Sequence, residues 1–269
     1  MNLFQAFLLG IVQGLTEFIP VSSTAHLLIA ANLLGVADNE RTFAFSVIIQ
    51  LGTVFALLVY FWKDFYEIAA AFLHGIQHRN LFENLQARLG WLIIVATIPA
   101  LIAGYLLKDI LHTIFKDTMM QGGIRLLFTS LLLIFAEYFD KRTRTLHSAT
   151  WLDALSVGLF QVLALFPGAS RSGTTIAGGM VRGFDRPSAA RFAFLMSAPI
   201  LIAAGAYESL KVIEMSGTRA FLPYLGIGFI TAAVVGWLAI KWLIAFLGKH
   251  SLYVFAAYCA IAGLIVLFL

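Results

Sequence analysis

Charged residues are scarce in this sequence of 269 residues, since Asp, Glu, Lys and Arg together make up 12% of it. A soluble domain carries about a quarter charged residues and is roughly half apolar. This chain is 61% hydrophobic and has a mean hydropathy of +0.91, which predicts an integral membrane protein. The net charge of +4 is too small and too scattered to indicate binding of nucleic acid. It fits basic loops beside an anionic membrane surface.

Cysteine is almost absent. Cys259 is the single one, so a disulfide within the chain is excluded, and its place in the last apolar stretch predicts a buried, inert thiol. A secretory signal peptide is not indicated either, because the apolar N-terminus lacks a basic region and continues into polar residues.

Apolar runs long enough to cross a hydrocarbon core of about 30 Å occur at six places. Four carry almost no charge, and two weaker ones have charges near their ends, where long side chains reach the interface. The four are Phe43–Trp62, Leu89–Leu107, Phe221–Ile240 and Leu252–Leu269, and the weaker two are Met119–Phe139 and Phe192–Tyr207. We predict six transmembrane helices.

Two further stretches, Leu3–Gly35 and Leu152–Phe184, have a different pattern. Each consists of two short apolar pieces interrupted by proline and small polar residues, at Pro20–Thr24 and at Pro167–Gly173. Neither piece is long enough to cross the membrane alone. Broken backbone at membrane depth is tolerated only inside protein or beside a wet cavity. We therefore expect two re-entrant helical hairpins whose tips meet near the midplane.

The two halves of the chain also resemble each other. Gly10-Ile-Val-Gln13 matches Gly158-Leu-Phe-Gln161, and Phe43-Ala-Phe45 matches Phe192-Ala-Phe194 at nearly the same offset. Each half contains one hairpin and three spans. An odd number of crossings turns the second copy upside down relative to the first, which is the inverted-topology repeat of many transporters.

The predicted architecture is thus an all-α polytopic membrane protein with a single membrane domain over residues 1–269. Repeat 1 covers about 1–139 and repeat 2 about 151–269. Ten basic residues fall on one predicted side and five on the other, which places the richer side in the cytoplasm and both termini outside. The loop Lys141–Thr150 is then expected inside and the loop Lys211–Arg219 outside.

The first hairpin carries polar groups that are costly in a bilayer. Gln13 and Glu17 are four residues apart, so they share one face of a helix. A carboxylate at membrane depth needs a cation, a proton or a network of donors. Glu17 is therefore interpreted as a metal ligand or a general acid or base. The alternative is a structural carboxylate that is hydrogen-bonded to the other hairpin.

Ser22, Ser23 and Thr24 follow Pro20 at the start of the second half of this hairpin. One of the three hydroxyls is expected to cap the helix, and the other two exceed what capping needs. A helix N-terminus is also a favourable site for an anion. His26 lies one turn after Ser23, within reach of it or of a bound phosphate, which favours a nucleophile or base over a structural histidine.

The second hairpin offers a permanent cation, Arg171. A guanidinium binds phosphate through two hydrogen bonds, and Gly168 and Gly173 allow the backbone to approach a ligand closely. Additional donors are the hydroxyls of Ser170, Ser172, Thr174 and Thr175. A buried arginine without an anionic partner is very costly, so its partner is Glu17 or a ligand. A purely structural pair of Arg171 with Glu17 is the alternative.

Other polar groups in the apolar runs are interpreted as packing, snorkelling or span-end residues, namely Gln50, Arg125, Glu137, Glu208 and Lys241. The remaining histidines show no spacing typical of metal ligands. The candidate site therefore consists of the two hairpins alone.

At these residues the chain resembles the undecaprenyl-diphosphate phosphatase family, integral membrane enzymes of the bacitracin-resistance type. The family is marked by Glu/Gln-x-x-x-Glu followed by Pro-x-Ser-Ser-Thr-x-His, and by Pro-Gly-x-Ser-Arg-Ser-Gly-x-Thr. Here these are Gln13 to Glu17, Pro20 to His26 and Pro167 to Thr175. The resemblance covers the whole chain. Gln13 is the permitted variant of the first motif position, which leaves Glu17 as the only carboxylate of the first hairpin.

The resemblance implies hydrolysis of undecaprenyl diphosphate to undecaprenyl phosphate and phosphate. This reaction recycles the lipid carrier of cell-wall synthesis and is associated with bacitracin resistance. The resemblance further implies a divalent cation, Mg²⁺ or Ca²⁺, and an active site at the outer face of the bacterial plasma membrane. The expected partners are the polyprenyl diphosphate substrate and membrane lipids. Whether the chain forms a homodimer stays open.

We therefore predict phosphoryl transfer by Ser23, His26, Glu17 and Arg171, with Glu17 also as metal ligand. Ser23 activated by His26 is the preferred nucleophile, while attack by His26 or by water stays open. The predicted substrate-binding residues are Gln13, Ser22, Thr24, Gly168, Ser170, Ser172, Thr174 and Thr175. The rival function is a polyprenyl-phosphate flippase or another inverted-repeat transporter. A structural protein would leave the buried charges unexplained.

Overall fold

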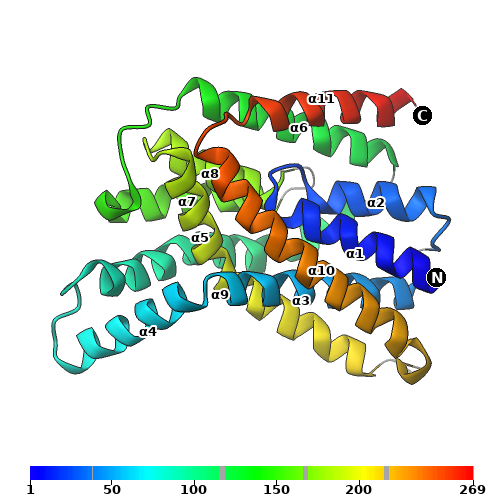
Figure 1. The fold of residues 1–269 in the computed structure, drawn as a ribbon, viewed down its shortest axis with the longest axis horizontal. Helices are drawn as coiled ribbons and strands as arrows, with labels where there is room; N and C mark the ends of the chain where they lie inside the picture. Colours follow the sequence, from blue (N-terminus) through cyan, green and yellow to red (C-terminus); the bar gives the residue numbers. More distant parts are fainter. Residues whose placement is uncertain (38, 115–118, 166–168, 215–217, 269) are drawn as a thin grey trace.

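The described chain is helical throughout. The computed structural model describes residues 1–37, 39–114, 119–165, 169–214 and 218–268, with side chains for all of these except 108–114, 211–214 and 218–220. Within these ranges it contains eleven α-helices, one short 3-10 turn, η1 (Leu146–Ser148), and no β-strand. The predicted all-α class is thus confirmed, and the helices lie side by side in an elongated bundle (Figure 1).

Five of the described helices are long and apolar enough to cross a membrane. They are α3 (Glu40–Tyr60), α5 (Leu85–Ile114), α6 (Met119–Tyr138), α9 (Arg186–Glu214) and α10 (Thr218–Leu247). The sixth predicted span is the apolar helix α11 (Tyr253–Phe268), which has only 16 residues. A helix rises 1.5 Å per residue, so α11 is about 24 Å long and shorter than the sequence suggested.

The two interrupted stretches form helix pairs. The first pair is α1 (Leu3–Phe18) with α2 (Ser23–Leu33), and the second is α7 (Trp151–Leu163) with α8 (Arg171–Val181). The pairs are entered from opposite ends of the bundle, and their tips meet in its middle (Figure 1). The hydroxyl of Ser172 donates to the carbonyl of Ile19 at 3.4 Å, which joins one tip to the other.

One interval relates the two pairs. The same 148 residues separate Leu3 from Trp151 and Ser23 from Arg171, the first residues of corresponding helices. A capping box also recurs at this interval. It is formed by Asn2 at the start of α1 and by Thr150 at the start of α7. The inverted repeat stays a prediction, and this constant interval supports it.

The first helix of each pair packs against a long helix, α1 against α10 and α7 against α5. Glycine permits both close approaches. A Cβ atom built on Gly10 would lie 2.9 Å from the carbonyl oxygen of Gly228, and one built on Gly158 would lie 2.5 Å from that of Ala96. Small residues that bring backbones together are typical of helix packing in membranes.

Ionic contacts hold the end of the bundle from which α7 enters. The Glu137 carboxylate accepts hydrogen bonds from Arg186 and, at 2.5 Å, from the backbone N–H of Leu252. The Asp153 carboxylate pairs with Arg144 and, at 2.7 Å, with Arg182. Glu137 lies in the last turn of α6, which fits the expected span-end place, and it does not snorkel, because both of its oxygens are bound to α9 and to the segment before α11.

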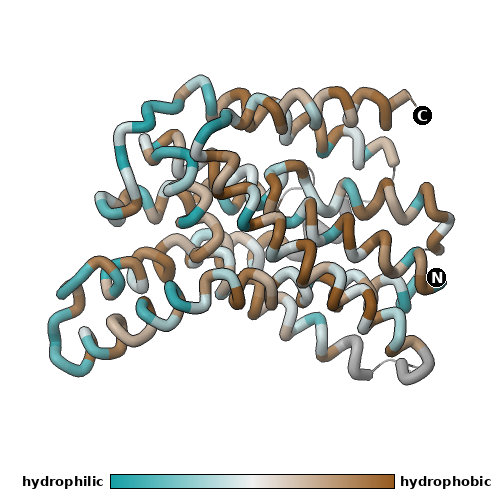
Figure 2. Tube along the Cα trace, in the orientation of Figure 1, coloured by the Kyte–Doolittle hydropathy of each residue, from teal (hydrophilic) through white to brown (hydrophobic). Residues whose placement is uncertain are grey.

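The segment between α3 and α5 contains one further helix, α4 (Trp62–Gln77). This helix extends from the end of the bundle and packs against the start of α5 (Figure 1). The connection between α4 and α5 is among the most hydrophilic parts of the chain, whereas the long helices are hydrophobic through their middle (Figure 2). The polar loops thus gather at the ends of the bundle.

The packing of α7 on α5 predicts that Gly158→Ala destabilises the protein. The added methyl group would overlap the Ala96 carbonyl oxygen, so backbone must move, at a cost of about 1–3 kcal/mol. The measurement is thermal unfolding in detergent. The matched control is Gly226→Ala on α10, where no atom lies within 4 Å of the new Cβ, and which is expected to melt like the parent or slightly higher. Equal melting of the two variants would contradict the close packing.

Candidate active site

Glu17 is the centre of the candidate site. Its side chain lies in the last turn of α1 and is 7% exposed. One carboxylate oxygen, Oε1, accepts from Nη2 of Arg171 at 2.7 Å. The other, Oε2, accepts from the hydroxyl of Ser23 at 2.7 Å and from Nε2 of Gln13 at 3.0 Å. The expected anionic partner of Arg171 is therefore Glu17, and the two helix-pair tips meet at an ion pair.

Local sequence explains how α1 presents these groups. Gln13 and Glu17 share one helix face because they are four residues apart, and Gln13 also approaches the hydroxyl of Thr53 on α3 at 3.4 Å. The helix ends at Phe18 because Ile19 precedes Pro20 and takes the extended conformation that proline favours in its neighbour. The polypeptide then turns, and Ser23 begins α2 beside Glu17.

Ser22 forms the tight part of this turn. Its backbone φ is +72°, which is rare and strained for a residue other than glycine. It occupies the N-cap position of α2, yet its side chain makes no capping hydrogen bond, so the cap expected from one of the three hydroxyls is not made at this position. The Ser22 hydroxyl instead lies 3.4 Å from that of Thr24.

The tip of the second pair uses most of its hydroxyls within its own first turn. Ser170 caps α8 by accepting from Gly173 N–H at 3.1 Å and contacts the Ser172 hydroxyl at 3.1 Å. Thr174 and Thr175 donate to the carbonyl of Arg171 at 2.9 and 2.8 Å. These four predicted substrate-binding residues therefore hold the helix start that presents Arg171. Gly168, another predicted substrate-binding residue, lies outside the described residues.

His26 differs most from its expected place. Its Nδ1 is 2.9 Å from the carbonyl oxygen of Ser22, and its Nε2 is 2.8 Å from the hydroxyl of Tyr258 on α11. In the described part of the chain, the hydrogen-bond partner of the Ser23 hydroxyl is Glu17 and not His26. The activation of Ser23 by His26 is thus not supported by the geometry. Tyr258 is not among the predicted site residues, because a tyrosine in an apolar run has no distinguishing signal.

The arrangement suits the chemistry of a phosphate. A guanidinium, a carboxylate and a serine hydroxyl lie within one hydrogen-bonded cluster, at the starts of two helices whose dipoles favour an anion. The available metal donors are oxygen atoms, which suits Mg²⁺ or Ca²⁺. Among the described residues, no group of three or more His, Cys, Asp or Glu side chains is close enough to hold a metal by itself.

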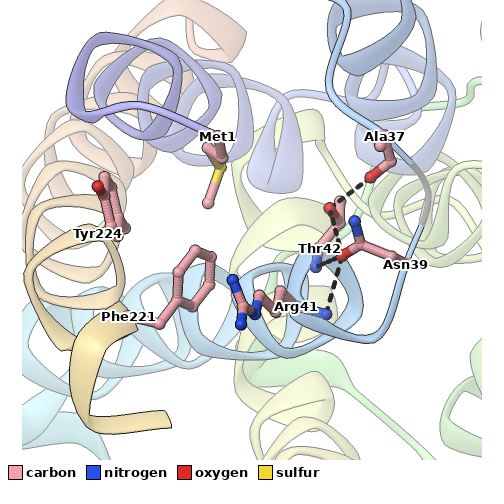
Figure 3. Close-up of a pocket in the computed structure, with 7 residues that line it drawn as sticks. All are labelled: Met1, Ala37, Asn39, Arg41, Thr42, Phe221 and Tyr224. Carbon is pink, nitrogen blue, oxygen red and sulfur yellow. Dashed lines mark hydrogen bonds between the residues drawn. The ribbon is translucent and has the colours of Figure 1, made fainter. Parts of the chain in front are cut away.

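A pocket of about 350 Å³ lies elsewhere, at the start of α1 (Figure 3). Its lining comes from the N-terminus, from the segment before α3 with the first turn of that helix, and from α10: Met1, Ala37, Asn39, Arg41, Thr42, Phe221 and Tyr224. Met1 and Glu17 are at opposite ends of α1, roughly 24 Å apart along the helix. The pocket contains none of the predicted site residues.

Comparison with known proteins agrees with the motifs. Residues 6–265 match the family described as bacitracin resistance protein BacA. An undecaprenyl-diphosphatase of Chloroherpeton thalassium is 42% identical over 99% of this chain and 96% of the relative. The undecaprenyl-diphosphatase of Myxococcus xanthus is 43% identical over 100% of this chain and 89% of the relative. That of Anaeromyxobacter dehalogenans is 44% identical, with coverage of 98% and 90%.

The ion pair predicts an energetic coupling between the two tips. Glu17→Gln leaves Arg171 without its anionic partner, and we expect a loss of about 2–3 kcal/mol because the pair is largely buried. The double variant Glu17→Gln with Arg171→Gln is expected to recover much of that loss, since neither charge then remains. The measurement is a double-mutant cycle by thermal unfolding in detergent. Additive losses would contradict the pair.

Proposed function

The chain belongs to the bacitracin resistance protein BacA family, and from this we propose that it is a membrane-bound undecaprenyl-diphosphatase. It hydrolyses undecaprenyl diphosphate to undecaprenyl phosphate and phosphate, which recycles the lipid carrier of cell-wall synthesis and confers bacitracin resistance. The structural observation that supports the proposal is the contact of buried Glu17 with both Arg171 and Ser23. Those three groups supply what phosphoryl transfer needs.

Arg171 is the group that binds the terminal phosphate. Its guanidinium offers a fork of donors that fits phosphate oxygens, and it stabilises the charge on the transferring phosphoryl group. In the structure, the guanidinium is paired with Glu17. As Arg171 turns towards the phosphate, one Glu17 oxygen becomes free.

Ser23 is the nucleophile in this mechanism. Its oxygen attacks the terminal phosphorus, and its proton passes to Glu17, whose Oε2 already accepts that hydrogen bond. The bond from phosphorus to the bridging oxygen breaks, and undecaprenyl phosphate leaves with the electron pair. Water then hydrolyses the phosphoserine to serine and phosphate. Glu17 thus replaces His26 as the base that faces Ser23.

A divalent cation fits this site as a companion of the substrate. Mg²⁺ binds to one or two carboxylates and takes its other ligands from phosphates and water, and Glu17 with the neighbouring hydroxyls offers such oxygen donors. The cation would neutralise charge on the diphosphate. Gln13 donates to Glu17 at 3.0 Å and so orients the carboxylate, both as base towards Ser23 and as ligand of the cation.

In the membrane, we place α3, α5, α6, α9, α10 and the shorter α11 as six crossings, with α1–α2 and α7–α8 as re-entrant pairs. The inverted repeat then covers about 1–139 and 151–269. Tips that meet in the middle of the bundle are the support for this arrangement (Figure 1). Both termini lie on the outer side of the bacterial plasma membrane, and the substrate reaches the site from that side.

The topology is tested with single cysteines on a Cys259→Ala background. Ser148→Cys is in η1, and Thr218→Cys is at the start of α10. One crossing, α9, separates the two positions, so an impermeant thiol reagent is expected to label Ser148→Cys from the inside and Thr218→Cys from the outside. Labelling of both from one side would contradict six crossings and the inverted repeat.

The activity is tested with purified protein in detergent. We expect phosphate release from undecaprenyl diphosphate with Mg²⁺ or Ca²⁺, and loss of release in excess chelator. Ser23→Ala is expected to lose at least about a thousandfold in kcat, because it removes the nucleophile. Trapping of a phosphoserine in the parent and not in this variant is the direct measurement.

Ser22→Ala is the matched control, because its hydroxyl contacts Thr24 and not Glu17. It is expected to keep much more activity than Ser23→Ala. Substantial turnover of Ser23→Ala beside an inactive His26→Ala would instead assign the attack to His26 or to water. A flippase needs no phosphate release in detergent, so an inactive parent protein would favour the transporter.

A further inference from the structure

The imidazole of His26 has both nitrogens bonded to the protein. Nδ1 lies 2.9 Å from the backbone carbonyl oxygen of Ser22, and a carbonyl only accepts, so Nδ1 carries the proton. In the neutral ring, Nε2 is then the acceptor, and the hydroxyl of Tyr258 donates to it at 2.8 Å. The Ser22 carbonyl therefore selects the Nδ1–H tautomer of His26, and the Tyr258 hydroxyl supplies the donor for the unprotonated Nε2.

Packing alone does not hold α2, which carries this histidine. Ala25 is its only buried residue, whereas α8 buries nine consecutive residues from Ser172 to Met180. Leu27, Ile29 and Ala30 are partly buried against the hydrophobic clusters, and a helix packed only in part depends more on its specific contacts. For His26 these contacts are the hydrogen bond to Tyr258 and the stacking of the two rings, whose centroids are 5.6 Å apart at 13°.

Tyr258 itself lies on a firm support. The Ser130 hydroxyl of α6 donates to the carbonyl of Ala256 at 2.8 Å, two residues before Tyr258. The two helices also meet at Gly123 and Gly263, each of which lies against the backbone carbonyl of the other. The start of α11 is held by the bond from Leu252 to Glu137. The part of α11 that carries Tyr258 is thus held independently of α2.

The link continues from His26 to the turn that carries Ser23. The strained carbonyl of Ser22 accepts from both Nδ1 and the backbone N–H of His26, the latter at 3.2 Å. Ser22 holds a φ of +72° with no capping bond from its side chain. Strain of this kind persists only when surrounding contacts maintain it.

We propose that Tyr258 is a positioning residue, whose hydroxyl donates to Nε2 of His26, holds the imidazole against the Ser22 carbonyl and thereby keeps the Ser22 turn and the Ser23 hydroxyl aligned on Glu17. This inference rests on the proposed phosphatase function for its kinetic consequence. The tautomer is a property of the protein without substrate and stands apart from that function. Tyr258 does not touch the reacting atoms; it acts through His26.

The test compares Tyr258→Phe with Tyr253→Phe. Both residues are on α11 and are about half exposed, at 47% and 48%. Tyr258→Phe keeps the stacked ring and removes only the hydroxyl. ¹⁵N NMR of histidine-labelled protein in detergent reports the tautomer, and the His26 signal is the one missing from His26→Gln.

We expect His26 of the parent and of Tyr253→Phe to be in the Nδ1–H form. In Tyr258→Phe the Nδ1–H form is expected to stay, because the Ser22 carbonyl still accepts from it, while the Nε2 signal is expected to shift because that nitrogen has lost its donor. The kcat of Tyr258→Phe is expected to fall about tenfold, as for the loss of one hydrogen bond, with KM changed less than about threefold. We expect kcat to change more than KM because the alignment of Ser23 affects the chemical step, while the contact of Arg171 with the phosphate remains.

An Nε2 signal in Tyr258→Phe equal to that of the parent would overturn the proposal, as would a shifted signal with a normal kcat. If Tyr258→Phe melts earlier than Tyr253→Phe, the variant is no longer a clean comparison, and the proposal is judged on the His26 signal of the parent protein. A parent His26 in the Nε2–H form contradicts the proposed bond. A parent protein that releases no phosphate overturns the proposed function, and the NMR result then still decides the tautomer.

Discussion

The ion pair between Glu17 and Arg171 is the interaction on which the rest of the structure depends. Either charge alone would be very costly at the middle of an apolar bundle. They come from helix-pair tips 154 residues apart in the sequence, and their contact at 2.7 Å joins the two tips. Because α1 ends one residue after Glu17 and α8 begins at Arg171, both charges reach the same place. Packing around them then serves to hold two ends of broken helices together.

The two helix pairs have the same layout and supply different groups to the site. The first residue of the second helix is Ser23 in one pair and Arg171 in the other, and both contact Glu17. The second pair is the fixed half, since α8 is buried on all sides and Asp153 pairs with Arg182 at its far end. The first pair carries the nucleophile on the sparsely packed α2. A fixed cation and an adjustable nucleophile suit a substrate that must enter and leave.

The proposed reaction uses the ion pair as a resting partner that the substrate displaces. The phosphate competes with Glu17 for Arg171, so binding of the anion and release of the base are one event. This coupling explains why a residue pair that looks structural at rest is compatible with catalysis. It also fits the hydroxyls of Thr174 and Thr175, which are directed at the backbone carbonyl of Arg171: Arg171 is the group of this tip that the phosphate meets.

The sequence by itself determined the elements and the kind of chemistry. Apolar runs, Pro20 and the small polar residues beside it predicted the long helices and the breaks, because transfer into lipid and backbone restriction are local properties. The cost of a buried charge predicted that Arg171 needs an anion such as Glu17. Tertiary structure alone decided the partners: Ser23 faces Glu17, and His26 meets Tyr258, 232 residues away. Glu137 likewise meets Arg186. Such contacts depend on how whole helices pack, and no local pattern of residues encodes that.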